Sequence, residues 1–156
     1  MSVLDTILTQ AQVAKTAVAA LTDTQRNSLL HAMAAALTAN RQEILAANAA
    51  DLESAKGRIS DVMLDRLRLT EERIAGMAAG VEEVRALQSP LGVTEREHIH
   101  QNGLRICKVR VPVGVIAIIY ESRPNVTSDA AALCLKSGNA CILRGGSDAI
   151  KTNTAI

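Results

Sequence analysis

In the first 88 residues, apolar side chains recur at steps of three and four, which predicts helices that each turn one face toward a core. Residues 2–21 have a helical composition and form the first predicted helix. Thr22 and Gln25 make a capping box, with a hydroxyl at the cap and a glutamine three residues later, so a long helix is expected from there to about Ala50. Its polar face is expected to be solvated surface and carries Arg26, Asn40, Arg41 and Asn48.

Two shorter helices complete the helical region that the sequence predicts over residues 1–88. After a break at Lys56-Gly57, Ser60 is suited to cap a helix over 61–66. Thr70 is suited to cap a further helix that runs to about Leu87.

The spacing of apolar residues along the sequence changes after the turn at Ser89 to Gly92. Residues 93–100 and 104–111 are mixed, alternating segments joined by Gln101-Asn102-Gly103. Asn-Gly between two strand-like segments is a strong signal for a β-hairpin, which we place at residues 89–111.

Residues 112–156 have the pattern of a βαβ unit. Val115 to Tyr120 is a continuous apolar run rich in β-branched residues, which predicts a strand buried on both faces. The further predicted elements are a helix over 125–136 opened by Pro124 and ended by Ser137-Gly138, a strand over 140–143, a turn at Gly145-Gly146, and a helix capped by Ser147 or Asp148.

The predicted fold class is therefore α/β, with a helical N-terminal half, a β-hairpin and the start of a parallel, Rossmann-like sheet. Parallel sheets bind ligands outside the carboxyl ends of their strands. The polar turns 121–125 and 144–147 both fall at such ends. We therefore expect the two turns to line one site.

Composition and charge exclude several classes of function. The formal net charge is +1 and Tyr120 is the one aromatic residue, so neither an electrostatic footprint nor a stacking platform for nucleic acid is present. No run approaches the roughly 20 apolar residues of a membrane span. The first 20 residues lack the basic and apolar regions of a secretion signal, which favours a cytoplasmic protein.

The cysteines and histidines predict neither a disulfide framework nor a metal site. The three cysteines are an odd number and form no Cys-x-x-Cys pair. Cys134 and Cys141 lie in apolar segments, where a neutral thiol is a small core residue, and Cys107 lies in the hairpin. His98 and His100 share one face of a predicted strand, where solvent-facing side chains are more common than metal ligands.

A single pair of parallel strands would leave bare sheet edges. The chain also ends inside a predicted helix that has no C-cap. We therefore expect it to be the amino-terminal part of a longer protein, or a protein that other chains complete.

Several motifs resemble the γ-glutamyl phosphate reductase (glutamate-5-semialdehyde dehydrogenase) family of the aldehyde dehydrogenase superfamily. Within them, the stretch from Tyr120 to Thr127 is specific to this reductase, whereas the superfamily in general has Pro-Trp-Asn there. The resemblance covers essentially all of the chain, although the family enzymes are much longer. The matching segments are Met63-Leu-Asp-Arg-Leu, Leu69-Thr, Arg73-Ile, Arg110-Val-Pro-Val-Gly-Val, Ile119-Tyr-Glu-Ser-Arg-Pro-Asn-Val-Thr, Leu133-Cys-Leu-Lys-Ser-Gly-Asn-Ala and Ile142-Leu-Arg-Gly-Gly.

The resemblance implies an NADPH-dependent reduction of L-glutamyl 5-phosphate to L-glutamate 5-semialdehyde, with release of phosphate, in proline biosynthesis. In the family a cysteine thiolate displaces phosphate from the acyl group, and hydride from NADPH then reduces the thioester. The resemblance places that cysteine and the catalytic domain outside this chain, so the chain is expected to be inactive by itself. It also implies a homo-oligomer, formed partly through a β-hairpin, and a functional link to glutamate 5-kinase.

The resemblance assigns Asn125 as a donor to the oxyanion that forms on the acyl group. The alternative is that Asn125 only caps a helix. Arg144 is assigned to the 2′-phosphate of NADP, with Gly145 and Gly146 giving the backbone access to the cofactor and Ser147 bonding the ribose. The alternative is a surface turn with a solvated arginine.

The remaining site residues expected along the path of the cofactor are Ser122, Arg123 and Pro124. Arg123 could instead contact the phosphate of the substrate, and the sequence leaves both possibilities open. Two other readings compete with the reductase. The chain could be a truncated, non-catalytic relative that binds a nucleotide or a partner, or an aldehyde-oxidising member of the superfamily, which the Tyr120 to Thr127 stretch disfavours.

Overall fold

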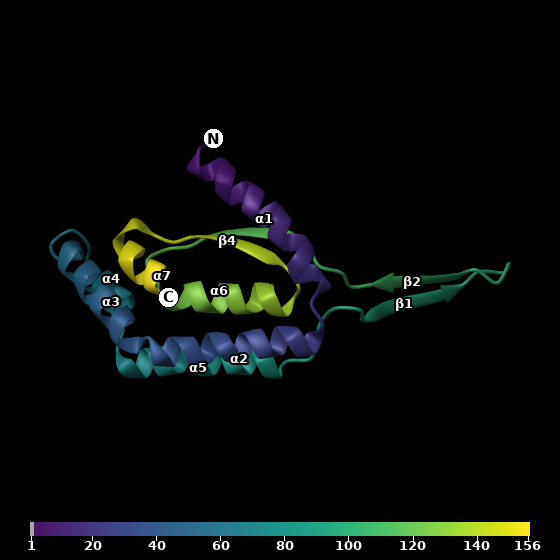
Figure 1. Cartoon of the computed structure of the whole chain (residues 1–156), viewed down its shortest axis with the longest axis horizontal. Helices are drawn as coiled ribbons and strands as arrows, with labels where there is room; N and C mark the ends of the chain where they lie inside the picture. Colours follow the sequence, from purple (N-terminus) through teal and green to yellow (C-terminus); the bar gives the residue numbers. More distant parts are fainter. Residues whose placement is uncertain (1) are drawn as a thin grey trace.

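The computed structural model describes residues 2–156, which form a layered body and a projecting hairpin (Figure 1). Helix α1 lies on one face of a two-stranded parallel sheet, α6 lies on the other face, and α2 and α5 pack against α6 from outside. The elements are α1 (Val3–Ala20), α2 (Asp23–Ala39), α3 (Arg41–Ala55), α4 (Asp61–Leu67), α5 (Glu71–Ala86), β1 (Thr94–Ile99), β2 (Arg105–Val109), β3 (Val115–Ile119), α6 (Asn125–Lys136), β4 (Ala140–Arg144), the 3₁₀ turn η1 (Ser147–Ala149) and α7 (Ile150–Ala155).

The structure confirms the predicted caps at Thr22, Ser60 and Thr70. The Thr22 hydroxyl accepts from the backbone N–H of Gln25, whose side chain accepts from the backbone N–H of Thr22. Ser60 and Thr70 cap α4 and α5 in the same way, through the N–H groups three residues further on. The hydroxyls therefore satisfy helix N–H groups that have no partner within the helix.

The predicted long helix from Thr22 to Ala50 is wrong, because the chain breaks at Asn40 into α2 and α3. The Asn40 side chain donates to the carbonyl oxygen of Ala36 at 2.9 Å, the acceptor that its own backbone N–H also uses. Such local side-chain bonds compete with continued helix. The break lets α3 turn away from α2 toward α7 (Figure 1).

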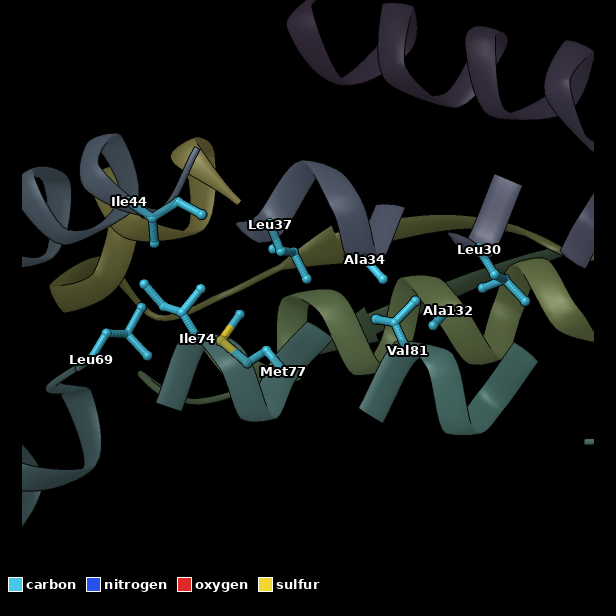
Figure 2. Packing of buried hydrophobic residues seen from close by; sticks show 9 residues of the cluster. All are labelled: Leu30, Ala34, Leu37, Ile44, Leu69, Ile74, Met77, Val81 and Ala132. Carbon is cyan, nitrogen blue, oxygen red and sulfur yellow. The ribbon is translucent and has the colours of Figure 1, made fainter. Parts of the chain in front are cut away.

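The main hydrophobic core lies between α2, α5 and α6 (Figure 2). It is aliphatic, as the composition requires, and most of its larger side chains come from α2 and α5. The buried cluster consists of Leu30, Ala34, Leu37, Ile44, Leu69, Ile74, Met77, Val81 and Ala132.

Arg26 and Asn48, expected on a solvated face, are both buried. Arg26 is 4% exposed and donates to the carbonyl oxygen of Leu21 at 2.5 Å. Asn48 is 1% exposed; its amide nitrogen donates to the carbonyl oxygen of Leu67 at 2.9 Å, and its oxygen accepts from the N–H of Leu69 at 2.8 Å. Buried backbone groups between α4 and α5 require such partners. Asn40 and Arg41 are exposed, as predicted.

The hairpin is an antiparallel ribbon in which every strand residue is exposed. His98 pairs with Ile106 and Glu97 with Cys107. Gly103 ends the connecting turn with a φ of 85°, a conformation that favours glycine. The turn therefore lies where the sequence predicted it.

Strands β3 and β4 are parallel, with Val115 opposite Ala140 and Ile119 opposite Arg144, and α6 connects them. Helix α6 matches its predicted bounds. The expectation that β3 is buried on both faces is wrong, because Ile119 is 77% exposed. Helices α1 and α6 pack mainly on β4, and β3 has a neighbouring strand on one side only.

Neither Ser147 nor Asp148 caps the last helix. The carboxylate of Asp51 in α3 performs that role and accepts from the N–H of Thr152 at 2.8 Å and from its hydroxyl at 2.7 Å. Asp148 instead forms an ion pair with Arg58 at 2.7 Å. The cap therefore comes from a residue about 100 positions earlier. In the part of the chain that the structure describes, no helix combines the length and apolar character needed to cross a bilayer.

Candidate functional site

The two polar turns lie side by side at the carboxyl ends of β3 and β4. The N–H of Tyr120 donates to the carbonyl oxygen of Arg144 at 3.1 Å, which continues the strand pairing into the turns. A side chain at Gly146 would collide with the hydroxyl of Ser122 and lie 3.1 Å from its backbone nitrogen. The close approach of the turns therefore requires glycine at position 146. The predicted adjacency of the turns is confirmed.

The turns open into two separate hollows rather than one shared site. The first, the Asn125 hollow, has a volume of about 490 Å³. Its lining residues are Asp65, Arg66, Arg68, Leu69, Arg73, Gly76, Met77, Arg123, Pro124, Asn125 and Asp129. The second, the Arg144 hollow, has a volume of about 480 Å³. Its lining residues are Tyr120, Thr127, Leu143, Arg144, Gly145, Ser147, Ile150, Asn153 and Thr154.

Asn125 begins α6 and its side chain is exposed to the first hollow. The side chain makes no capping bond, so the reading of Asn125 as a helix cap only is not supported. Its amide nitrogen donates to Oδ2 of Asp129, one helical turn further on, at 3.1 Å. An amide nitrogen carries two hydrogens, and the second has no acceptor among residues 2–156. One N–H is therefore oriented by Asp129 while the other remains available.

Arg144 ends β4 and is exposed at the second hollow, where its guanidinium makes no hydrogen bond or ion pair with residues 2–156. Ser147 is exposed at the same hollow. An unpaired arginine beside a free hydroxyl suits an anionic ligand such as a phosphate group.

The glycines of this turn are explained by packing within the chain. A side chain at Gly145 would collide with the amide nitrogen of Asn153 and lie 3.1 Å from the Tyr120 ring. The hydroxyls of Tyr120 and Thr127 are 2.7 Å apart, and Thr127 donates to the Asn153 oxygen at 3.2 Å. This polar network lies against Gly145, and sequence reasoning assigned none of its members to the site.

Ser122, Arg123 and Pro124 differ in their exposure. Ser122 and Pro124 are buried and shape the first turn, whereas Arg123 is exposed. Arg123 lines the Asn125 hollow, not the Arg144 hollow. Arg123 and Arg144 therefore line different hollows, whereas the sequence had left open whether Arg123 lies with Arg144 along the cofactor path or contacts the substrate.

Sequence reasoning also missed the charged residues that α4 and its following loop add to the Asn125 hollow, namely Asp65, Arg66 and Arg68. A signal was present, because Asp65 and Arg66 belong to the Met63 to Leu67 motif, which carried part of the family resemblance.

The two cysteines of the body, Cys134 and Cys141, show no sign of a reactive thiolate. Burial raises the pKa of the Cys134 thiol to about 11, and it also raises the pKa of Cys141. Nucleophilic cysteines need a lowered pKa, so these two thiols behave as core residues. Cys107 is exposed on the hairpin. Within residues 2–156, no three His, Cys, Asp or Glu side chains are grouped so that they could hold a metal ion.

The fold is that of the aldehyde dehydrogenases. A probable aldehyde dehydrogenase from Listeria monocytogenes superposes with a TM-score of 0.65 over 92% of this chain and 29% of its own, at 16% identity. A likeness at that identity defines the fold alone. No family model matches the chain.

Higher identity links the chain to one reductase. The crystal structure of γ-glutamyl phosphate reductase from Thermotoga maritima matches with a TM-score of 0.91 and 42% identity, over 94% of this chain and 36% of its own. A γ-glutamyl phosphate reductase from Xanthomonas oryzae is 54% identical over 154 residues, which are 98% of this chain and 37% of the relative. The predicted resemblance to γ-glutamyl phosphate reductases is confirmed, and the chain spans little more than a third of the length of these relatives.

Proposed function

We propose that this chain supplies the cofactor-binding part of an NADP-dependent γ-glutamyl phosphate reductase. The reaction reduces L-glutamyl 5-phosphate to L-glutamate 5-semialdehyde, releases phosphate and serves proline biosynthesis. The observation that carries the proposal is the 54% identity to a γ-glutamyl phosphate reductase over 98% of the chain. In this proposal the nucleophilic thiol comes from outside these residues: burial raises the pKa of Cys134 and Cys141, and none of the three cysteines lines either hollow.

In this proposal Asn125 stabilises the reacting acyl group. Attack on an acyl phosphate builds negative charge on the acyl oxygen, and a fixed, uncharged N–H donor lowers the energy of that state. The free N–H of Asn125 supports this role, since the other N–H holds the amide in place against Asp129.

The residues of the Arg144 hollow fit a phosphorylated cofactor. The guanidinium of Arg144 would bind the 2′-phosphate of NADP and the hydroxyl of Ser147 would bond the ribose. Gly145 and Gly146 shape the turn that presents them, and Ser122 and Pro124 shape the neighbouring turn, where Ser122 lies against Gly146. The bound nicotinamide supplies the hydride. Arg123 belongs to the substrate side, because it lines the hollow of Asn125.

The expected partners belong to the same proposal. The hairpin, whose strands are exposed along their whole length, supports a homo-oligomer in which β1 and β2 contact another subunit. Glutamate 5-kinase would supply the acyl phosphate.

The assignment of Arg144 is tested with Arg144→Ala in the full-length protein. We expect the preference for NADPH over NADH, measured as the ratio of kcat/KM values, to fall about 10- to 100-fold, because a charge-assisted pair with the 2′-phosphate is lost. Arg41→Ala, which removes an exposed arginine outside both hollows, is the control and should leave the ratio unchanged. An unchanged preference in Arg144→Ala would remove the proposed contact.

A further inference from the structure

Charged side chains of both signs line the Asn125 hollow, and some of them form hydrogen bonds or ion pairs within the chain. One guanidinium nitrogen of Arg73 donates to the carbonyl oxygens of Asp65 and Arg68, each at 2.6 Å. The other lies 3.4 Å from both carboxylate oxygens of Asp65. Arg73 and Asp65 therefore fix the wall of the hollow and cancel each other's charge.

The other charged groups of this hollow have free bonding capacity. The exposed arginines Arg66, Arg68 and Arg123 make no side-chain hydrogen bond or ion pair with residues 2–156. Asp129 is half-buried and bonds Asn125 through Oδ2 only. Its Oδ1 accepts no hydrogen bond from residues 2–156 and lies near Gly80 of α5, where a Cβ would be 3.9 Å away.

We propose that Oδ1 of Asp129 binds the α-ammonium group of the substrate, and that the unpaired arginines bind its anionic groups. This inference rests on the proposed function and adds a specificity-determining residue to it. The hollow would then select an amino-acid acyl phosphate over acyl phosphates that lack the ammonium group. Its volume of about 490 Å³ lies in the ordinary range of small-molecule sites, about 300–1,000 Å³.

The charges of the hollow and of such a ligand are complementary. Three unpaired arginines against one free carboxylate leave two positive charges in the hollow. An amino-acid acyl phosphate carries one ammonium, one carboxylate and a phosphate group of about −1.5 to −2, so its net charge is close to minus two. Matching of opposite charges favours both binding and orientation.

Because Asp129 lies beside Asn125, a bound ammonium group should affect the rate of the reaction as well as substrate binding. A carboxylate whose oxygen lies 3.1 Å from the Asn125 amide nitrogen opposes negative charge that builds near that amide. A bound ammonium compensates the carboxylate. A substrate without the group therefore loses a binding contact and also reacts next to an uncompensated negative charge, so kcat should fall as well as KM rise.

The test compares two aldehydes in the reverse direction with the full-length protein. NADP⁺ accepts hydride from the aldehyde carbon while phosphate forms the new acyl–oxygen bond and one proton is released. The substrates are L-glutamate 5-semialdehyde and 5-oxopentanoate, which differ only by the amino group. We expect the wild-type preference for the amino substrate, as a ratio of kcat/KM values, to fall about 10- to 100-fold in Asp129→Asn.

Asp129→Asn keeps an oxygen that can accept from Asn125 but removes the charge. Glu83→Gln removes an exposed carboxylate of α5 outside both hollows and should leave the ratio unchanged. A second measurement needs no variant: L-glutamate should inhibit the wild-type protein at least tenfold more strongly than glutarate, which lacks the amino group. If Asp129→Asn uses both aldehydes with an unchanged ratio, or if the two acids inhibit equally, the proposed role of Asp129 is wrong. The proposed function would not be affected by either result. Failure of the wild-type protein to use either aldehyde would overturn the proposed function as well.

Discussion

The body of this protein buries some of its charged side chains, whereas every charged residue in the hairpin strands is exposed. In the hairpin the ion pairs lie in solvent, as between Arg105 and Glu97 at 2.8 Å. In the body the charged side chains Lys136 and Asp51 are each 3% exposed. Exposed ion pairs are screened and contribute little, whereas a buried charge that loses its partners is costly. The two regions should therefore respond very differently to the loss of one charge.

Lys136 shows how a buried charge joins elements of the body. Its ammonium group donates to the Asn27 side chain at 2.8 Å, to the carbonyl oxygen of Arg85 at 3.1 Å and to the Asp23 carboxylate at 3.3 Å. These partners belong to α2 and α5. A single side chain at the end of α6 therefore connects all three helices around the core.

The largest effect is expected for Asp51→Ala. The substitution leaves the N–H and hydroxyl of Thr152 buried without an acceptor and removes the cap of α7. We expect a loss of about 2–4 kcal/mol in the free energy of unfolding. Urea unfolding followed by circular dichroism measures it.

The matched control is Asp61→Ala, which removes an exposed carboxylate from the first turn of α4. It should cost less than about 1 kcal/mol. Equal losses in the two variants would show that the buried cap does not stabilise the body more than a surface carboxylate does.

The sequence predicts the parts of this fold whose causes are local. A hydroxyl three residues from an unpaired N–H, as at Thr22 and Thr70, is visible in the sequence and marks a helix start correctly. The Asn-Gly turn and the bounds of α6 are of the same kind. Asn48 and Asp51 could not be predicted as buried, because their partners Leu69 and Thr152 lie far away along the chain.

The candidate site likewise has one feature that the sequence predicts and one that it does not. Parallel strands imply that the two polar turns are neighbours, and the sequence showed both strands. The division into two hollows depends on how α4 and α5 pack beside the start of α6, which no local pattern encodes. For that reason Asp129 and Arg68 were not recognised from the sequence, although the nearby Asn125 was.

A second prediction compares two thiols, Cys107 on the hairpin and Cys134 in the body. Burial raises the pKa of Cys134 to about 11, so the folded state holds the neutral thiol. At pH 8 we expect iodoacetamide to modify exposed Cys107 at least tenfold faster than Cys134. Mass spectrometry of peptides after short pulses measures both rates.

The pH dependence of this labelling has a definite sign. The stabilisation from keeping Cys134 neutral is complete below the ordinary thiol value of 9.0 and is lost as the pH rises toward about 11. Labelling of Cys134 should therefore increase steeply across that interval. Equal labelling of both cysteines at pH 8 would contradict the burial of Cys134.

The smallest effect is expected for Glu97→Gln in the hairpin. This change removes the two-bond ion pair in which Arg105 donates to both carboxylate oxygens at 2.8 Å. Both side chains are accessible to water and salt, so we expect no measurable shift of the thermal midpoint. Lys136→Met, which removes one buried charge and leaves the Arg85 carbonyl without that donor, should lower the midpoint clearly under the same conditions. A loss in Glu97→Gln as large as that in Lys136→Met would mean that the hairpin depends on its charges as the body does, and the contrast between the two regions would fail.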